Sequence, residues 1–166
     1  MFSRRKKSSA APAPAPGVAL RHAVLTLDPT EVGISRSDGE VWAAVMDVPL
    51  GDNSWYCLVC IGDGTTSLYT NGSFGIIGAG QWPDVRTRSQ RLLSLVGDHL
   101  DLFEPATSDD PGSEGSLVLR AMTWSGAKWI VAPSEQVMSG AHPASSIFEA
   151  ANDVVTAVRE QYERQG

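Results

Sequence analysis

Cysteine is scarce in this 166-residue sequence, because Cys57 and Cys60 are the only two. So few thiols exclude a disulfide framework. Their C-x-x-C spacing lies in an apolar segment that predicts a β-strand, where residues three apart point to opposite faces. The two thiolates therefore cannot meet one metal ion or each other, and zinc needs two further ligands. We expect two small buried side chains, with no metal and no other cofactor.

Long apolar segments are also missing. The longest run, residues 55–61, has the length of a strand, whereas a membrane helix needs about 20 apolar residues. No membrane span is therefore predicted. An Ala-Pro repeat follows the basic start of the chain, where a secretory signal would carry an apolar region. These features predict a cytoplasmic protein.

Positive charge is scarce beyond residue 17. Four of the 13 basic residues, Arg4, Arg5, Lys6 and Lys7, precede that point, together with no acidic residue. The rest of the chain carries 9 basic against 19 acidic side chains, a net charge of −10. Nucleic acid is not an expected partner, since basic side chains supply much of that affinity. We expect a protein partner or a second copy, and at most a weak electrostatic membrane contact through the four basic residues.

The composition divides the chain into a tail and one domain. Residues 1–17 combine basic side chains with a Pro-Ala repeat, which cannot build a core and favours extended polyproline geometry. The chain as a whole is 42% hydrophobic, near the norm for globular proteins. We expect a disordered basic tail at residues 1–17 and a single α+β domain at residues 18–166.

Residues 41–77 predict a β-meander. Residues 41–48 and 54–61 are apolar on both faces, as central strands are when both faces of a sheet are covered. Residues 65–70 alternate and are rich in β-branched and aromatic side chains, and residues 73–77 close the meander. Turn signals separate these segments at Gly51-Asp52-Asn53, at Gly62-Asp63-Gly64 with type I′ character, and at Asn71-Gly72.

Two helices and a hairpin complete the pattern. One helix is expected from Pro83 until Pro105 ends it. Residues 116–124 and 128–132 predict the hairpin. Residues 144–165 predict the longest helix, with its apolar side including Tyr162, and Ser139 or Ser145 can cap it. The order indicates an α+β fold in which an antiparallel meander and a hairpin form one sheet covered by two main helices.

Particular motifs carry a resemblance to known families. The order of elements and the Asp63-Gly64 and Asn71-Gly72 turns resemble the roadblock/longin and profilin-like folds. Roadblock proteins dimerise and regulate small GTPases, but likeness of architecture does not carry a function with it. Residues 42–159 also resemble a widespread family of small uncharacterised bacterial proteins, which brings no function. That second likeness rests on Asp63-Gly64-Thr65-Thr66-Ser67-Leu68-Tyr69, Gly75-Ile76-Ile77-Gly78-Ala79-Gly80, His142-Pro143 and Phe148-Glu149-Ala150.

A glycine-rich turn is the first candidate site. Gly78 and Gly80 precede a helix whose first turns carry Arg86 and Arg88. Free N–H groups and the helix dipole favour anions at such a place, so a phosphate or nucleotide is one hypothesis. The motif lacks the third glycine of a dinucleotide fingerprint and the Gly-Lys-Ser/Thr of a P-loop. Glycines at a tight β–α crossing explain the same residues.

Trp124 and Trp129, which flank the expected hairpin turn, are the second candidate site. Tryptophan is enriched at interface hot spots, although it also fills cores. The acidic segment 107–115 lacks the ligand spacing of a calcium loop, and a solvated, flexible loop is expected there.

No catalytic constellation is evident, since there is no Gly-x-Ser-x-Gly elbow and no spacing ties serine, histidine and aspartate together. The leading hypothesis is therefore a non-enzymatic interaction or regulatory module that forms a homodimer. A phosphate- or nucleotide-binding protein that uses residues 78–88 comes second, and a small hydrolase third.

Overall fold

The computed structural model describes residues 12–166, so the four basic residues expected in the tail lie outside the described part of the chain. The strands are β1 (Val41–Gly51), β2 (Ser54–Ile61), β3 (Thr66–Thr70), β4 (Gly75–Ile76), β5 (Glu104–Pro105), β6 (Ser116–Thr123) and β7 (Gly126–Pro133). The α-helices are α1 (Pro16–Leu25), α2 (Pro83–Asp98), α3 (Ser134–Met138) and α4 (Ser145–Gln165).

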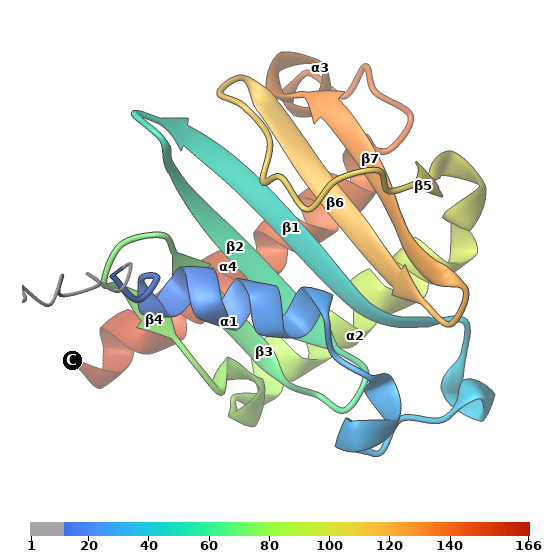
Figure 1. Cartoon of the computed structure of the whole chain (residues 1–166), viewed down its shortest axis with the longest axis horizontal. Coiled ribbons are helices and arrows are strands. Elements are labelled where there is room, and N and C mark those ends of the chain that lie inside the picture. The colour runs from blue at the N-terminus through green and yellow to red at the C-terminus, as the bar shows by residue number, and fades with distance from the viewer. Residues whose placement is uncertain (1–11) are drawn as a thin grey trace, which may run out of the picture.

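The strands form one antiparallel sheet in the order β4-β3-β2-β1-β6-β7-β5. The expected meander is β1 to β4, the expected hairpin is β6–β7, and β6 joins the two by pairing with β1. After β4 the chain forms α2 and returns at the opposite edge of the sheet through β5 (Figure 1). The predicted α+β fold, with an antiparallel sheet covered by helices, is confirmed.

Two hairpin turns differ in their backbone conformation. Between β1 and β2, Asp52 and Asn53 have positive φ angles of 51° and 58°, as a type I′ turn requires. In the turn between β2 and β3, Gly64 has a positive φ of 96° but Gly62 and Asp63 do not. The expectation of a type I′ turn there is wrong. The Asp63 carboxylate instead accepts a hydrogen bond of 2.8 Å from Thr65 N, which closes a longer turn.

One face of the sheet is covered by α2 and α4, which lie behind it in Figure 1. Pro83 opens α2 as expected, but the helix ends at Asp98, and Pro105 belongs to β5. Tyr162 was expected on the buried side of α4 and is half exposed, because it lies in the last turns of the helix, beside the short edge strand β4. The inward side chains of this face form the larger core cluster, which includes Leu58, Cys60, Val85, Leu92, Val96, Ile147 and Val154.

The other face carries a smaller core beneath α1, which crosses in front of the sheet in Figure 1. Val24 of α1 packs there with the alternate side chains of β1 and β2, such as Val45 and Val59. Cys57 belongs to this cluster, whereas Cys60 belongs to the cluster under α2 and α4. The expectation of two buried, unpaired cysteines on opposite faces of one strand is confirmed.

The chain becomes helical two residues before the expected domain start at Val18, since α1 begins at Pro16. Proline suits a first helical turn because its missing N–H would have no helical partner there. Gly17 is buried against β3, where a Cβ atom would lie only 1.8 Å from the carbonyl oxygen of Thr70. This close approach requires glycine, so the last residues expected in the tail belong to the folded domain.

Candidate functional site: a buried ion network and a groove

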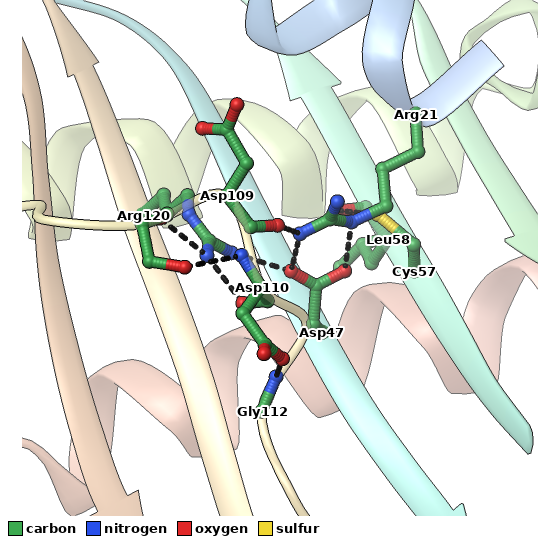
Figure 2. A network of polar contacts seen from close by, with 9 residues as sticks. Arg21, Asp47, Cys57, Leu58, Asp109, Asp110, Gly112 and Arg120 are labelled. Atoms are coloured by element: carbon green, nitrogen blue, oxygen red, sulfur yellow. Dashed lines mark hydrogen bonds and ion pairs between the residues drawn. The ribbon is translucent and has the colours of Figure 1, made fainter. Parts of the chain in front are cut away.

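A buried ion network occupies the α1 face of the sheet. Asp47 of β1 is fully buried, and its carboxylate faces Arg21 of α1 and Arg120 of β6 (Figure 2). Arg21 binds it through two hydrogen bonds, Nε to Oδ1 at 2.9 Å and Nη2 to Oδ2 at 2.8 Å. Arg120 donates from Nη1 to Oδ2 at 2.5 Å. One carboxylate therefore joins a helix and two strands that are far apart in the sequence.

The loop between β5 and β6 completes the network with backbone oxygens. Arg21 Nη2 donates to the carbonyl of Asp109 at 2.6 Å. Arg120 Nη2 donates to the carbonyls of Asp110, at 2.6 Å, and Ser108, at 3.2 Å. The expectation of a solvated, flexible loop at residues 107–115 therefore needs correction. Its side chains at 108–110 are exposed, but its backbone is fixed to the sheet by buried arginines, a contact that side-chain composition does not reveal.

Two guanidinium groups share a single carboxylate, so the network holds one excess positive charge. Burial disfavours the charged form of Arg21, but the hydrogen bonds and the attraction of Asp47 outweigh it and raise the pKa of Arg21. For Arg120, burial dominates and lowers the pKa, despite the attraction of Asp47. Both remain charged at neutral pH, because the pKa of arginine starts above about 12. The rings of Trp55 and Trp129 lie 5.7 and 5.4 Å from these guanidinium groups and stabilise the excess charge by cation–π attraction.

Two buried cysteines lie near the network, Cys57 on the same face of the sheet and Cys60 on the opposite face. Cys57 faces Asp47 across β1 and β2, and burial, together with the carboxylate, raises the pKa of Cys57 well above its usual value. Burial also raises the pKa of Cys60 to about 12. Since the thiolate is the reactive form, the raised pKa values and the burial of both groups disfavour their reaction at neutral pH while the fold is closed. The network thus has a structural use, which is to tie α1 and the β5–β6 loop to the sheet.

The glycines of the first candidate site have separate structural explanations. Gly78 has a positive φ of 75°, where a residue without a Cβ is favoured. Gly80 is buried against the β2–β3 turn, and a Cβ atom there would lie 1.9 Å from the carbonyl oxygen of Gly64. The glycines of this turn therefore permit the close crossing of two loops.

The arginines after this turn do not converge on one point. Arg86 turns back and donates from Nε to the Gly80 carbonyl at 3.0 Å. Arg88 points elsewhere, to the Asp84 carboxylate at 3.2 Å and to the carbonyl of Asp153 in α4 at 3.4 Å. Both guanidinium groups already have partners within the chain. Anion binding by Gly78, Gly80, Arg86 and Arg88 stays a prediction, and the contacts of these side chains do not form a cradle.

Both tryptophans of the second candidate site are half-buried on the α1 face. Trp124 donates from Nε1 to the carbonyl of Gly39 at 3.0 Å, and Arg36 lies 5.4 Å from its ring centroid. Trp129 contacts Arg120 of the network. Each ring therefore has a contact within the chain, and a role in an interface stays a prediction.

A groove lies on the opposite face of the sheet, between α3 and the first half of α4. Its volume is about 590 Å³. Met46 and Val48 of β1 line it from the sheet, and Phe148 lines it from α4. Ser145 also lines it, and its Oγ is shielded from solvent without a hydrogen-bond partner among the described residues. The expectation that Ser139 or Ser145 caps α4 is wrong, because Ala144 is the N-cap residue and no side chain bonds the first turn.

Exposed apolar side chains gather at the β4 edge of the sheet. Phe74, just before β4, is 47% exposed, and Ile77, just after it, is 65% exposed. Tyr162 of α4 is 49% exposed and packs edge-to-face on Phe74, with ring centroids 5.8 Å apart. We call these three residues the edge patch.

The side chains of residues 12–166 also bear on metal and membrane binding. In this range no group of three or more His, Cys, Asp or Glu side chains is arranged to hold a metal ion. None of the helices described has the length and apolar character needed to cross a bilayer. The network, the groove and the edge patch remain the candidate functional features of the described residues.

In comparison with known proteins, no family model, no curated protein and no solved structure matches the chain. The resemblance to roadblock/longin architecture and to the small bacterial family stays a prediction. Sequence reasoning missed the network and the groove. A signal for the network was present, since Asp47 and Arg120 each interrupt a strand that is otherwise apolar on both faces.

Proposed function

We propose that the protein is a non-enzymatic interaction module that forms a homodimer through the β4 edge of its sheet. The edge patch carries the proposal, because it places two aromatic side chains in contact with each other, and an isoleucine at the other end of β4, in solvent along one edge of the sheet. Aromatic residues are enriched among the side chains that dominate binding energy at interfaces. Their gathering at one end of the sheet favours a contact surface over scattered exposure.

The β4 edge is also suited to a second copy of the same chain. The outer side of β4 has no strand partner among the described residues, so its backbone groups are available for pairing. Two such edges can pair about a two-fold axis, with each edge patch facing the other, because a two-fold interface uses the same surface on both subunits. With only Gly75–Ile76 in β4, the apolar side chains supply most of the contact.

Charge sets the conditions for this association. Residues 18–166 have a net charge of −10, so two copies repel at long range. Salt screens that repulsion. An apolar edge interface therefore predicts a dimer that becomes tighter as ionic strength rises. Association of the basic residues 4–7 with the acidic domain of another copy would instead weaken with salt.

Analytical ultracentrifugation of the full chain at high micromolar concentration tests the proposal. We expect a dimer for the wild type and a monomer for the double variant Phe74→Ser with Tyr162→Ser. Met138→Ser is the matched control, since Met138 is 84% exposed but belongs to α3, away from the edge patch. A wild type that sediments as a monomer throughout the concentration range contradicts the proposal, as does a double variant that dimerises normally.

We also propose that the protein is cytoplasmic and acts without a cofactor. Two unpaired cysteines, held on opposite faces of one strand, support a reducing compartment. The burial of both thiols, which raises the pKa of each, supports a binding rather than a catalytic role.

A further inference from the structure

One side chain joins two neighbouring turns of the sheet. Asn71 follows β3 and reaches across to the turn between β1 and β2. Its Nδ2 donates to the carbonyl oxygen of Asn53 at 2.6 Å, and its Oδ1 accepts a hydrogen bond of 3.0 Å from Trp55 N. We call these two side-chain hydrogen bonds the Asn71 bridge. The backbone N–H of Asn71 also donates to the carbonyl of Trp55 at 3.3 Å, so the residue extends the pairing of β2 with β3.

The Asn71 bridge requires a carboxamide. A backbone N–H donates and a carbonyl oxygen accepts, so the side chain between them must offer one acceptor and one donor. Aspartate has almost the same shape as asparagine, but its ionised carboxylate only accepts. In place of Nδ2, a carboxylate oxygen would face the carbonyl oxygen of Asn53, with no hydrogen between the two acceptors. Exchange of the amide for an acid therefore breaks the bridge while the shape of the side chain is kept.

The residue after Asn71 makes this exchange chemically accessible. Gly72 is exposed, has no side chain to shield its backbone nitrogen, and its N–H has no backbone partner among the described residues. The Gly72 nitrogen can attack Asn71 Cγ to form a succinimide, while the Cγ–Nδ2 bond breaks and Nδ2 leaves as ammonia with the proton of the Gly72 N–H. Water then opens the ring at Cγ, which gives aspartate, or at the backbone carbonyl carbon, which gives isoaspartate.

The turn that Asn71 holds also positions part of the edge patch. Thr70 N and Thr70 Oγ1 both donate to the carbonyl of Phe74, at 3.1 and 2.8 Å, so residues 71–73 form a short loop that leads directly into Phe74. The ring of Phe74 in turn packs on Tyr162. Loss of the Asn71 bridge frees this loop from the β1–β2 turn and loosens the edge on which the two aromatic side chains meet.

We propose that Asn71 is a site of spontaneous deamidation, and that the acidic product releases the β3–β4 turn and weakens association through the edge patch. The effect on association rests on the proposed homodimer, whereas the modification and the release of the turn do not. Both polar atoms of the side chain are engaged in the bridge. The carboxamide must therefore leave the bridge before Cγ can rotate onto the Gly72 nitrogen, so the reaction follows opening of the turn.

The other two asparagines of the chain provide an internal comparison. Asparagine is a chemically labile residue in general, but its neighbours decide its rate. Asn152 lies within α4, where the helical hydrogen bonds fix the backbone of the residue that follows. Asn53 is followed by Ser54, whose side chain hinders attack by its nitrogen. Asn71 should therefore react first.

Incubation of the full chain at mildly alkaline pH, followed by chymotrypsin digestion and mass spectrometry, tests the site. We expect the Asn71 peptide to gain the mass of amide-to-acid exchange before the peptides of Asn53 and Asn152 do. Gly72→Ala is the matched variant, because Gly72 has no positive φ and a Cβ there would meet only Thr70 Oγ1, at 3.7 Å. Alanine thus fits the turn but hinders the attack, and conversion of Asn71 should be slower. Later conversion of Asn71 than of the other asparagines, or equal rates in Gly72→Ala and the wild type, overturns the assignment.

Asn71→Asp reproduces one product and tests its effect on the turn. Hydrogen exchange of the amides of residues 70–76 should be at least about ten-fold faster than in the wild type, because the variant forfeits at least one net hydrogen bond. Asn53→Asp is the matched control. It adds the same charge in the adjoining turn, where the side chain is exposed, but keeps the backbone carbonyl that Asn71 binds. Equal exchange in the two variants overturns the release of the turn.

Sedimentation of the same two variants tests the effect on association. Asn71→Asp should raise the dimer dissociation constant by at least about ten-fold, whereas Asn53→Asp should leave it close to that of the wild type. A wild type that dimerises beside an Asn71→Asp variant that dimerises equally well overturns this effect while the homodimer stands. A monomeric wild type overturns the homodimer and with it the effect on association, and mass spectrometry and hydrogen exchange then decide the rest of the inference.

Discussion

The two faces of the sheet are held by different physical means. On one face, α2 and α4 bury a continuous apolar core against the strands, whereas the buried charged side chains of the described residues, Arg21, Asp47 and Arg120, lie on the other face. On the other face, the ten-residue helix α1 and a loop without regular structure cover a smaller apolar cluster and the Asp47 network. Apolar area stabilises the first face without directional requirements, whereas the second needs particular atoms at particular distances.

This difference bears on how each face responds to change. A close-packed apolar core tolerates exchange among side chains of similar volume. A buried charge network does not, because removal of one member leaves the others charged, buried and unpaired. We therefore expect the α1 face to be the more sensitive to single polar substitutions and the more readily opened by thermal fluctuation.

The largest expected effect is the loss of Asp47. Asp47→Ala leaves two buried guanidinium groups without their carboxylate, and we expect the free energy of unfolding to fall by about 3–5 kcal/mol. Asp84→Ala is the matched control, since it breaks the exposed ion pair with Arg88, and such pairs contribute about 0–1 kcal/mol. Urea unfolding of both variants measures the difference. Equal losses would show that the network stabilises the fold no more than a surface ion pair does.

An intermediate effect is expected for the accessibility of the two thiols. Cys60→Ala leaves only Cys57, beneath α1, and Cys57→Ala leaves only Cys60, beneath α2 and α4. Local opening exposes the less stable region first, so Cys57 should react with a maleimide at least about ten-fold faster than Cys60, which corresponds to a difference in opening free energy of about 1.4 kcal/mol. Labelling rates under native conditions, corrected for each variant's stability, provide the measurement. Faster labelling of Cys60 would reverse the assignment of the weaker face.

The last pair of variants changes stability in opposite directions at two glycines. A Cβ at Gly17 of α1 would meet the Thr70 carbonyl oxygen at 1.8 Å, whereas at Gly97 of α2 it would meet nothing within 4 Å. Gly17→Ala should therefore force α1 away from β3 and destabilise the protein by about 1–3 kcal/mol. Gly97→Ala should stabilise it by about 0.5–1 kcal/mol, because alanine is the better helix former. Thermal midpoints that shift in the same direction would contradict the close packing of α1 against β3.

The sequence predicted the face covered by α2 and α4 well, because the signals for its strands and helices are local. Apolar runs in residues 41–48 and 54–61 indicated central strands, and the periodic apolar stripe after Pro83 indicated a packed helix. The α1 face depends on pairs that no local pattern connects. Arg21 and Arg120 are 26 and 73 residues from Asp47, so nothing in the spacing of these residues identified them as partners.

The candidate sites also combine features that the local sequence predicts with contacts that it does not predict. Gly78 and Gly80 were correctly recognised as residues with special backbone requirements, but the direction of Arg86 and Arg88 depends on carbonyl groups that any residue carries. The groove depends on how α3 packs against α4 and β7, and no local pattern predicts those contacts. Sequence patterns identify which faces are apolar, but they do not show where packing leaves space.

The way Arg21 and Arg120 hold the β5–β6 loop has a consequence for protein engineering. Because the arginines bind main-chain oxygens of Ser108, Asp109 and Asp110, the number of residues in the loop is constrained. The side chains of Ser108 and Asp110 also contribute, since they accept hydrogen bonds from the N–H groups of Asp110 and Gly112. Gly112 and Gly115 have positive φ angles of 94° and 84°, and a Cβ at Gly112 would lie 2.8 Å from Val118. The loop is thus a site where exposed positions without such contacts, such as Thr107 and Ser113, can be randomised at constant length, to display new binding residues on a backbone that the buried arginines keep in place.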